Sequence, residues 1–337
     1  MRQRNSTIEL LRIVSMAMVL MVHFVGATFG LPTRYQLLDL QADALWKDAL
    51  ESLSIVGVNC FVLISGYFGI RATWRKLLDF TLWCLFASLL VYVCRCVESG
   101  RLASGFMGSI MIYSKTDLWF VPAYLALFII SPLLNAGFES LEDRRLLLML
   151  LGLTFLNVYL GWWHGGRINP TGYNEMQMIY VYFLGYCLRR KQAQLQKLTI
   201  WIYLSAYAAA TVATGLLLDF SYNSPFVLLA SMSLFMVFAK MPSFSSPAIN
   251  WVSASAFMVY LLHKNPYFWL KIKSALKSLY SANDAVMFIC LSALLFVSIC
   301  VGCILIDKVR MPVCRYVVNK IASCVEAIKQ SIASAEK

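Results

Sequence analysis

The sequence predicts an all-α integral membrane protein of about ten transmembrane helices, with its N- and C-termini in the cytoplasm. Hydrophobic residues fill 60% of its 337 positions and charged residues only 14%, whereas about a quarter of the residues in a soluble domain are charged. The second observation is a series of long apolar runs. The hydrocarbon core of a bilayer offers no hydrogen-bond partner to the backbone, and a helix satisfies its own backbone groups, so each run is expected to be helical. The third is the uneven distribution of Lys and Arg between the loops.

Most of the apolar segments are long enough to cross a hydrocarbon core of about 30 Å. The shortest, 177–188, is expected to extend outward to Asn174, and the run 102–113 is expected to form a re-entrant or interfacial helix instead of a crossing. The ten predicted crossings are 7–30, 52–70, 77–97, 118–136, 146–163, 177–188, 198–218, 224–239, 249–270 and 286–306.

Basic residues indicate the orientation. A cytoplasmic N-terminus and ten crossings place the strongly basic loops 71–76 and 189–197 inside, as the positive-inside rule requires. The exception is the last outer loop, which carries four lysines between Lys264 and Lys277. Residues 1–310 are expected to form one membrane domain, and 311–337 a short cytoplasmic tail that is either an amphipathic surface helix or a frayed end.

The composition also excludes some partners. The net charge of +12 does not indicate nucleic acid, because no basic and aromatic patch lies outside the apolar segments. No metal site is expected: Cys300 and Cys303 have the CxxC spacing, but they lie within one apolar helix and no second pair accompanies them. The lipid bilayer is therefore the partner that composition predicts, and the oligomeric state is left open.

Three ionisable residues, Glu9, Arg12 and His23, lie in the first apolar segment. Arg12 and His23 differ by only about 20° around a helix axis and by about 16 Å along it, and Glu9 lies one turn from Arg12. A charged group at membrane depth costs several kcal/mol unless it faces protein or water. This face is therefore either a functional stripe, or an interfacial Glu9–Arg12 ion pair with a hydrogen-bonded core histidine.

The order of acidic residue, two residues, Arg, ten residues and His resembles the first helix of membrane-bound acyltransferase family 3. Enzymes of that family O-acetylate surface polysaccharides, peptidoglycan or smaller sugars. Three later segments are similar to the family's motifs in the same order, so that the resemblance covers residues 1 to about 310. They are the segment Glu51–Arg71 with its motif Phe61-Val-Leu-Ile-Ser-Gly-Tyr67, then Asp117-Leu-Trp-Phe-Val-Pro-Ala-Tyr-Leu125 and Tyr260-Leu-Leu-His263.

The resemblance implies an inner (plasma) membrane O-acyltransferase. It would move an acetyl group from cytoplasmic acetyl-CoA to a hydroxyl of a cell-surface polysaccharide or a lipid-linked sugar, the glycan acceptor. His23 would act as general base or acyl carrier, Glu9 would orient Arg12, and Arg12 would bind a donor phosphate. Arg71 and Arg75 would steer the anionic donor, although their spacing is one residue longer than the family's Arg-x-x-Arg.

Five further residues are expected to bind substrate: Ser65, Trp119, Tyr124, Tyr260 and His263. Other interpretations of them stay open, namely close helix packing for Ser65, pocket-wall or interfacial aromatics for Trp119 and Tyr124, and an interfacial histidine at a helix end for His263.

The main competing function is a polysaccharide flippase or transporter without acyl transfer. A transporter often has an internal repeat or helices broken by Gly and Pro at matched positions, and neither is visible in the sequence. The sequence does not distinguish acetyl from succinyl as the transferred group.

Overall fold

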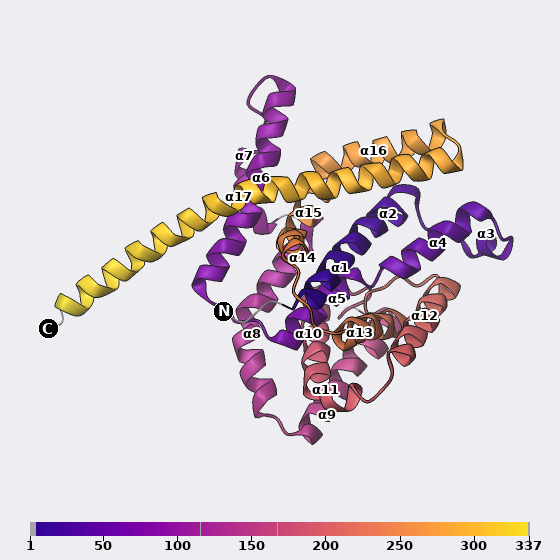
Figure 1. Ribbon diagram of the computed structural model, residues 1–337, viewed down its shortest axis with the longest axis horizontal. Helices are drawn as coiled ribbons and strands as arrows, with labels where there is room; N and C mark the ends of the chain where they lie inside the picture. The colour runs from indigo at the N-terminus through magenta and orange to yellow at the C-terminus, as the bar shows by residue number, and fades with distance from the viewer. Residues whose placement is uncertain (1–4, 115, 167, 336–337) are drawn as a thin grey trace.

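The computed structural model describes residues 5–114, 116–166 and 168–335, and these residues form helices joined by turns, without a β-strand (Figure 1). The helices are α1 (Ser6–Phe24), α2 (Gly26–Phe29), α3 (Arg34–Leu38), α4 (Ala42–Ser54), α5 (Gly57–Phe68), α6 (Trp74–Ser99), α7 (Phe106–Ile110), η1 (Ile112–Ser114), η2 (Thr116–Leu118), α8 (Phe120–Ser140), α9 (Asp143–Thr154), η3 (Phe155–Trp163), α10 (Glu175–Arg190), α11 (Gln192–Leu195), α12 (Ile200–Leu217), α13 (Pro225–Lys240), α14 (Pro247–Ser253), α15 (Ala256–His263), α16 (Pro266–Ala282) and α17 (Ala285–Ala335).

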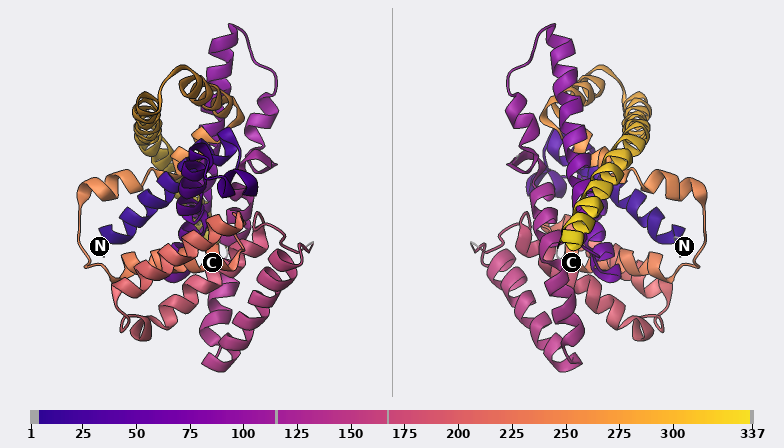
Figure 2. Two further views of the ribbon diagram at one scale, coloured as in Figure 1. Left: turned by 90° about the vertical axis from the view of Figure 1, so that its right-hand side faces the viewer. Right: turned by 90° about the vertical axis from the view of Figure 1, so that its left-hand side faces the viewer.

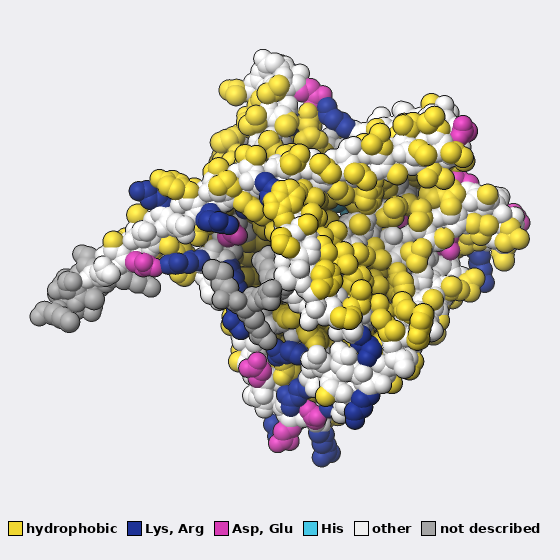
Figure 3. Space-filling model, viewed as in Figure 1, with side chains coloured by type: hydrophobic (Ala, Val, Ile, Leu, Met, Phe, Trp, Pro, Cys, Tyr) yellow, Lys and Arg dark blue, Asp and Glu magenta, His cyan; other side chains and the backbone are white. Residues whose placement is uncertain are grey.

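Within the described residues, seven helical stretches are long and apolar enough to cross a membrane, and each overlaps a predicted crossing. Apolar side chains cover much of the face in Figure 3, and Lys and Arg gather toward the end where α9 and α11 lie. The all-α membrane fold is therefore confirmed, whereas the count of ten and the orientation remain predictions. The seven stretches are Ser6–Phe29, Ala42–Phe68, Trp74–Ser99, Phe120–Ser140, Asp143–Trp163, Ile200–Leu217 and Ala285–Ile328.

The predicted crossing 249–270 is divided, not continuous. Helix α14 ends at Ser253, α15 ends at His263, and α16 begins at Pro266. Proline has no N–H and favours the first turn of a new helix, and the Asn265 side chain caps α16 by accepting the N–H of Tyr267 at 3.2 Å. The lysine-rich stretch is therefore a separate helix, which lies alongside α17 (Figures 1 and 2).

The second crossing begins ten residues before the predicted start at residue 52, because α4 continues back to Ala42. Four charged residues in this stretch lower its hydropathy, and two of them, Asp43 and Lys47, form an ion pair of 2.5 Å across one helical turn. At the other end of the chain, 311–335 continues α17 without a break at Pro312. Arg310 joins α17 to α6 by lying 4.2 Å from the Trp83 ring centroid.

Helix α1 lies at the centre of the bundle and contacts α4, α5, α13, α14 and α15. The closest pair beside it is α5 and α10, which meet at two glycines. A Cβ on Gly66 would collide with the carbonyl oxygen of Tyr182, and one on Gly185 would collide with that of Leu63. Small residues let two helix backbones approach in a membrane, so Gly66 sets how closely α10 packs on α5.

Replacing Gly66 by alanine is therefore expected to destabilise the protein by about 1–3 kcal/mol through overpacking. Gly137→Ala is the matched control, because Gly137 also lies in a helix and a Cβ there meets nothing within 4 Å. The measurement is the thermal unfolding midpoint of each variant in detergent. Equal midpoints for the two variants would contradict this packing role.

Ten crossings with cytoplasmic termini predict the location of three reporter fusions, placed after Lys76, Lys191 and Lys308. All three should report cytoplasm, because the basic loops 71–76 and 189–197 are separated by an even number of crossings. Paired alkaline phosphatase and fluorescent protein fusions measure this. A phosphatase-active fusion after Lys191 would overturn the orientation.

Candidate active site

Two cavities of similar volume lie along α1. The first, which we call the arginine cavity, has a volume of about 460 Å³ and contains Glu9, Arg12 and Arg71 in its lining. The second, the histidine cavity, has a volume of about 470 Å³ and contains His23 and Glu51 in its lining. Both volumes fall within the usual range for small-molecule sites. The polar stripe predicted on α1 thus faces the protein interior at two levels.

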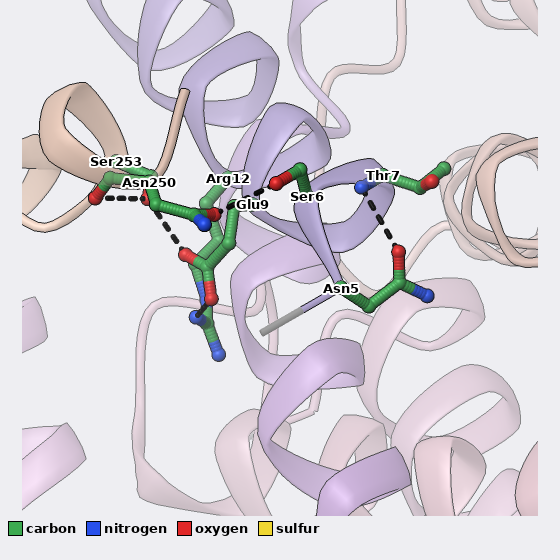
Figure 4. A network of polar contacts seen from close by, with 7 residues as sticks. All are labelled: Asn5, Ser6, Thr7, Glu9, Arg12, Asn250 and Ser253. Carbon is green, nitrogen blue, oxygen red and sulfur yellow. Dashed lines mark hydrogen bonds and ion pairs between the residues drawn. The ribbon is translucent and has the colours of Figure 1, made fainter. Parts of the chain in front are cut away.

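Glu9 and Arg12 form an ion pair of 2.6 Å in the arginine cavity (Figure 4). The second carboxylate oxygen of Glu9 accepts a hydrogen bond of 2.7 Å from the Ser253 hydroxyl of α14. Glu9 is only 6% exposed, whereas the Arg12 side chain retains 35% of its exposure. Glu9 is therefore fixed by its partners, and Arg12 keeps donors directed at the cavity.

The start of α1 is held by a polar network, part of which Figure 4 shows. The Asn5 side chain caps the helix by accepting the N–H of Thr7 at 3.0 Å, the standard role of asparagine at this position. The Ser6 hydroxyl donates to the side-chain oxygen of Asn250 at 3.0 Å. The bond from Ser6 and that of Ser253 to Glu9 tie α1 to α14, so the position of the Glu9–Arg12 pair is set by both helices.

Of the other predicted donor-binding residues, Arg71 lies in the lining of the arginine cavity and Arg75 does not. Arg75 instead pairs with Glu326 of α17 and lies 5.5 Å from the Trp74 ring centroid. Lys76, which the sequence places in the same basic loop, joins the lining and donates to the Arg71 carbonyl at 3.0 Å. The cavity wall therefore carries three cationic side chains, those of Arg12, Arg71 and Lys76.

The two histidines of the family motifs meet in the structure. Nδ1 of His23 lies 2.8 Å from Nε2 of His263, and Nδ1 of His263 lies 2.5 Å from the carbonyl oxygen of Val259. A carbonyl only accepts, so His263 donates from Nδ1, and its neutral ring accepts at Nε2 from Nδ1–H of His23. This network leaves Nε2 of a neutral His23 without a proton and free to accept one.

His263 does end a helix, as one interpretation of the sequence had it, but its environment is not an interface. It is 1% exposed and lies against α1, because the break between α14 and α15 directs the end of α15 inward. Trp269 of α16 borders the pair, with its ring centroid 5.7 Å from that of His23. Contact between positions 23 and 263 depends on tertiary packing that no local pattern reports.

Three phenylalanines, Phe61, Phe120 and Phe257, belong to the linings of both cavities, and we call them the phenylalanine collar. Tyr124 stacks on Phe120 with ring centroids 5.5 Å apart, and its hydroxyl lies 3.3 Å from that of Ser65. Ser65 and Tyr124 thus belong to the arginine cavity, on the far side of the collar from His23. The collar is where an elongated molecule would pass from one cavity to the other.

The remaining predicted residues, Trp119 and Tyr260, line the histidine cavity. Trp119 contacts two tyrosines absent from the site prediction, with ring-centroid distances of 5.0 Å to Tyr173 and 5.9 Å to Tyr222. Burial and the neighbouring Tyr173 raise the pKa of Tyr222 well above its usual value, so this phenol keeps its proton at neutral pH. The histidine cavity thus has an aromatic wall beside a potential base.

Sequence reasoning missed Glu51, Lys264, Tyr173 and Tyr222 of the histidine cavity. Tyr173 and Tyr222 lie in connections between helices, where no periodicity marks a buried side chain. Glu51 fell just outside the predicted crossing 52–70, and although it begins the segment that is similar to the family's second helix, it was not included among the site residues. A helix extended back to Ala42 would have revealed it.

Another groove, of about 890 Å³, lies on the other side of α1 and contains none of the predicted site residues. Its lining is mostly apolar and comes from α1, α2, α4, α16 and α17, with Phe24, Phe29 and Phe296 among its residues. Such a lining suits hydrocarbon chains, and the titratable side chains in it, those of Asp43 and Tyr280, include no histidine. The chemistry is therefore assigned to the two smaller cavities.

Comparison with known protein families agrees with the motifs. The family model described as an acyltransferase domain, that of acyltransferase family 3, matches residues 5–308, a range that includes both cavities and all four motif segments. No curated protein and no solved structure shows significant similarity to the chain. The matched range covers most of the 337 residues. The chain therefore belongs to the membrane-bound acyltransferase family 3.

Proposed function

We propose that this protein transfers an acetyl group from cytoplasmic acetyl-CoA to a hydroxyl of a cell-surface polysaccharide or a lipid-linked sugar, in the plasma membrane. The observation that carries the proposal is that a cavity with three cationic side chains and a cavity with the His23–His263 pair both lie along α1, with the phenylalanine collar shared between them. The donor's phosphates and the acceptor's hydroxyl would then occupy different cavities, and only the thioester arm would pass the collar.

The arginine cavity suits the phosphate end of the donor. One guanidinium nitrogen of Arg12 pairs with Glu9, and the remaining N–H donors match the geometry of a phosphate. Arg71 and Lys76 add positive charge to the same wall. Ser65 and Tyr124 lie on the path toward the collar, where hydroxyl groups are suited to the amides of the donor's arm. His23 lies about 16 Å from Arg12 along the helix axis. The thioester arm of the donor must be extended to span this distance.

The histidine cavity suits the transfer step. Nε2 of His23 takes the proton of an acceptor hydroxyl, and the hydroxyl oxygen forms a bond to the thioester carbonyl carbon. The carbon–sulfur bond then breaks, and the imidazolium returns the proton to the departing CoA thiolate. His263 accepts the Nδ1–H of His23, which fixes the tautomer and stabilises the imidazolium while it exists. In a two-step route the same Nε2 would carry the acetyl group.

A flippase without acyl transfer is the competing function, and it has no use for an unprotonated histidine nitrogen in a cavity. The decisive experiment compares surface glycans from a deletion strain with those from the same strain carrying the gene. Mass spectrometry should show acetylated glycan units only in the complemented strain. Unchanged acetylation together with a loss of surface glycan in the deletion strain would favour the flippase.

Arg12→Lys is expected to raise the KM for acetyl-CoA about tenfold, and Arg12→Ala about a hundredfold, with little change in kcat. These factors correspond to losing part or all of a charge-assisted contact of about 1.5–3 kcal/mol. Lysine preserves a positive charge for Glu9 but lacks the planar fork. The measurement is acetyl transfer in membranes over a range of acetyl-CoA concentrations.

The matched control for this prediction is Arg144→Ala, which removes an exposed arginine of α9 that lines neither cavity. Its KM should equal that of the wild type. An Arg12→Ala protein with wild-type KM at limiting acetyl-CoA would show that Arg12 does not bind the donor.

A further inference from the structure

Glu51 is a buried carboxyl group that the transfer step above does not use. The residue is 4% exposed and lines the histidine cavity. One oxygen accepts the N–H of Gly26 at 3.1 Å, and among the described residues no other hydrogen bond and no ion pair to this carboxyl is present. A carboxyl group with so few partners at membrane depth costs several kcal/mol. Folding alone does not explain its presence.

The backbone beside His23 is shaped to admit this carboxyl group. Gly26 begins α2, three residues after His23. A Cβ at position 26 would lie 2.8 Å from both carboxyl oxygens of Glu51, so any other residue would push the carboxyl away. Glycine at the break between α1 and α2 thus brings a hydrogen-bond acceptor to the same cavity wall as the base.

The rest of the wall has the features of a sugar-binding site. Trp119, Tyr173 and Tyr222 form an aromatic cluster, with Tyr173 and Tyr222 ring centroids 4.6 Å apart. The Tyr260 hydroxyl is buried and has no hydrogen-bond partner in the described part of the chain. An aromatic face covers the apolar face of a sugar ring, and buried polar groups without partners bind its hydroxyls.

We propose that Glu51 binds the acceptor, by accepting a hydrogen bond from one hydroxyl of a sugar ring that stacks on the Trp119 cluster. This contact presents a neighbouring hydroxyl of the same ring to Nε2 of His23. The inference rests on the proposed acetyl transfer and deepens it, because it assigns acceptor binding to Glu51 and leaves donor binding to the arginine cavity. Glu51 is then a determinant of which sugar is acetylated.

The rival role for Glu51 is structural, as a cap on the first N–H of α2. Glutamine separates the two roles, because its side-chain oxygen can still accept the N–H of Gly26 while the second carboxyl oxygen, the acceptor for the sugar hydroxyl, is replaced by an NH2 group that only donates. A structural cap predicts that Glu51→Gln resembles the wild type. A role in acceptor binding predicts a change confined to the kinetics of the acceptor.

The test uses the full-length protein in membranes, with acetyl-CoA as donor and surface glycan purified from the deletion strain as acceptor. Glu51→Gln should raise the KM for the glycan about tenfold and Glu51→Ala about a hundredfold, with the KM for acetyl-CoA within about twofold of wild type. Asp48→Asn, one turn away and outside the cavity lining, is the matched control and should leave both constants unchanged.

A Glu51→Gln protein with the wild-type KM for the glycan would overturn the proposal, and so would an equal rise in the KM for both substrates. If the Glu51→Ala protein accumulates poorly, the glutamine variant still tests the proposal, because it retains the cap on α2. Failure of the wild-type protein itself to acetylate the glycan would instead reject the proposed function, so the two failures are distinguishable.

Discussion

His23→Ala should lower glycan acetylation by about 10²–10⁴-fold, the usual contribution of a general base, while the protein still accumulates in the membrane. The physical reason is that Nε2 of His23 carries no proton and, unlike Nε2 of His263, accepts no hydrogen bond within the pair, and His23 belongs to the cavity with the aromatic wall. The measurement is the acetyl content of surface glycan per unit of membrane protein in a complemented deletion strain.

His23→Gln is the informative companion variant. Glutamine can donate a hydrogen bond to His263 and fill much of the same space, but it cannot take a proton at neutral pH. We expect it to be as inactive as the alanine variant. If His23 were only a hydrogen-bonded core residue, glutamine would restore activity and alanine would chiefly reduce abundance, and that pattern would remove His23 from the mechanism.

His263→Phe should reduce acetyl transfer by about 10²-fold or more. Without an acceptor at this position, Nδ1–H of His23 loses its partner, and the imidazolium formed during transfer loses its support. The residue is a positioning residue, since it acts on the acceptor hydroxyl only through His23. The measurement is kcat in membranes at saturating concentrations of both substrates.

His263→Gln provides the discriminating control for this second prediction. The glutamine side-chain oxygen reaches a position similar to that of Nε2 and can accept the same hydrogen bond, so we expect at least a tenfold recovery in kcat relative to His263→Phe. Equal kcat values for the phenylalanine and glutamine variants at equal protein levels would show that the hydrogen bond to His23 does not matter.

The fold class and half of the site follow from local properties of the sequence. Hydropathy is a sum over neighbouring residues, so it located seven stretches that the structure also has as long apolar helices. The spacing of Glu9 and Arg12 is a property of one helix, and the ion pair they form needs no distant partner to be foreseen. Helical periodicity also placed Arg12 and His23 on the same side of α1.

Features that depend on tertiary packing were not accessible in this way. The contact between His23 and His263 joins residues 240 positions apart, and it requires the inward turn at the end of α15. Hydropathy also placed the start of the second membrane helix too late, after Glu51, because the charged side chains of α4 lower the same sum that identifies the helix.

The most direct test of acetyl transfer from the cytoplasmic side supplies labelled acetyl-CoA to sealed membrane vesicles of opposite orientation and measures label in the glycan. Inside-out vesicles, which present the cytoplasmic face to the donor, should label the glycan, and right-side-out vesicles should not, because the charged donor does not cross the bilayer. His23→Gln should abolish the signal in the inside-out vesicles. Equal labelling in both orientations, or full labelling with the His23→Gln protein, would contradict the proposed mechanism.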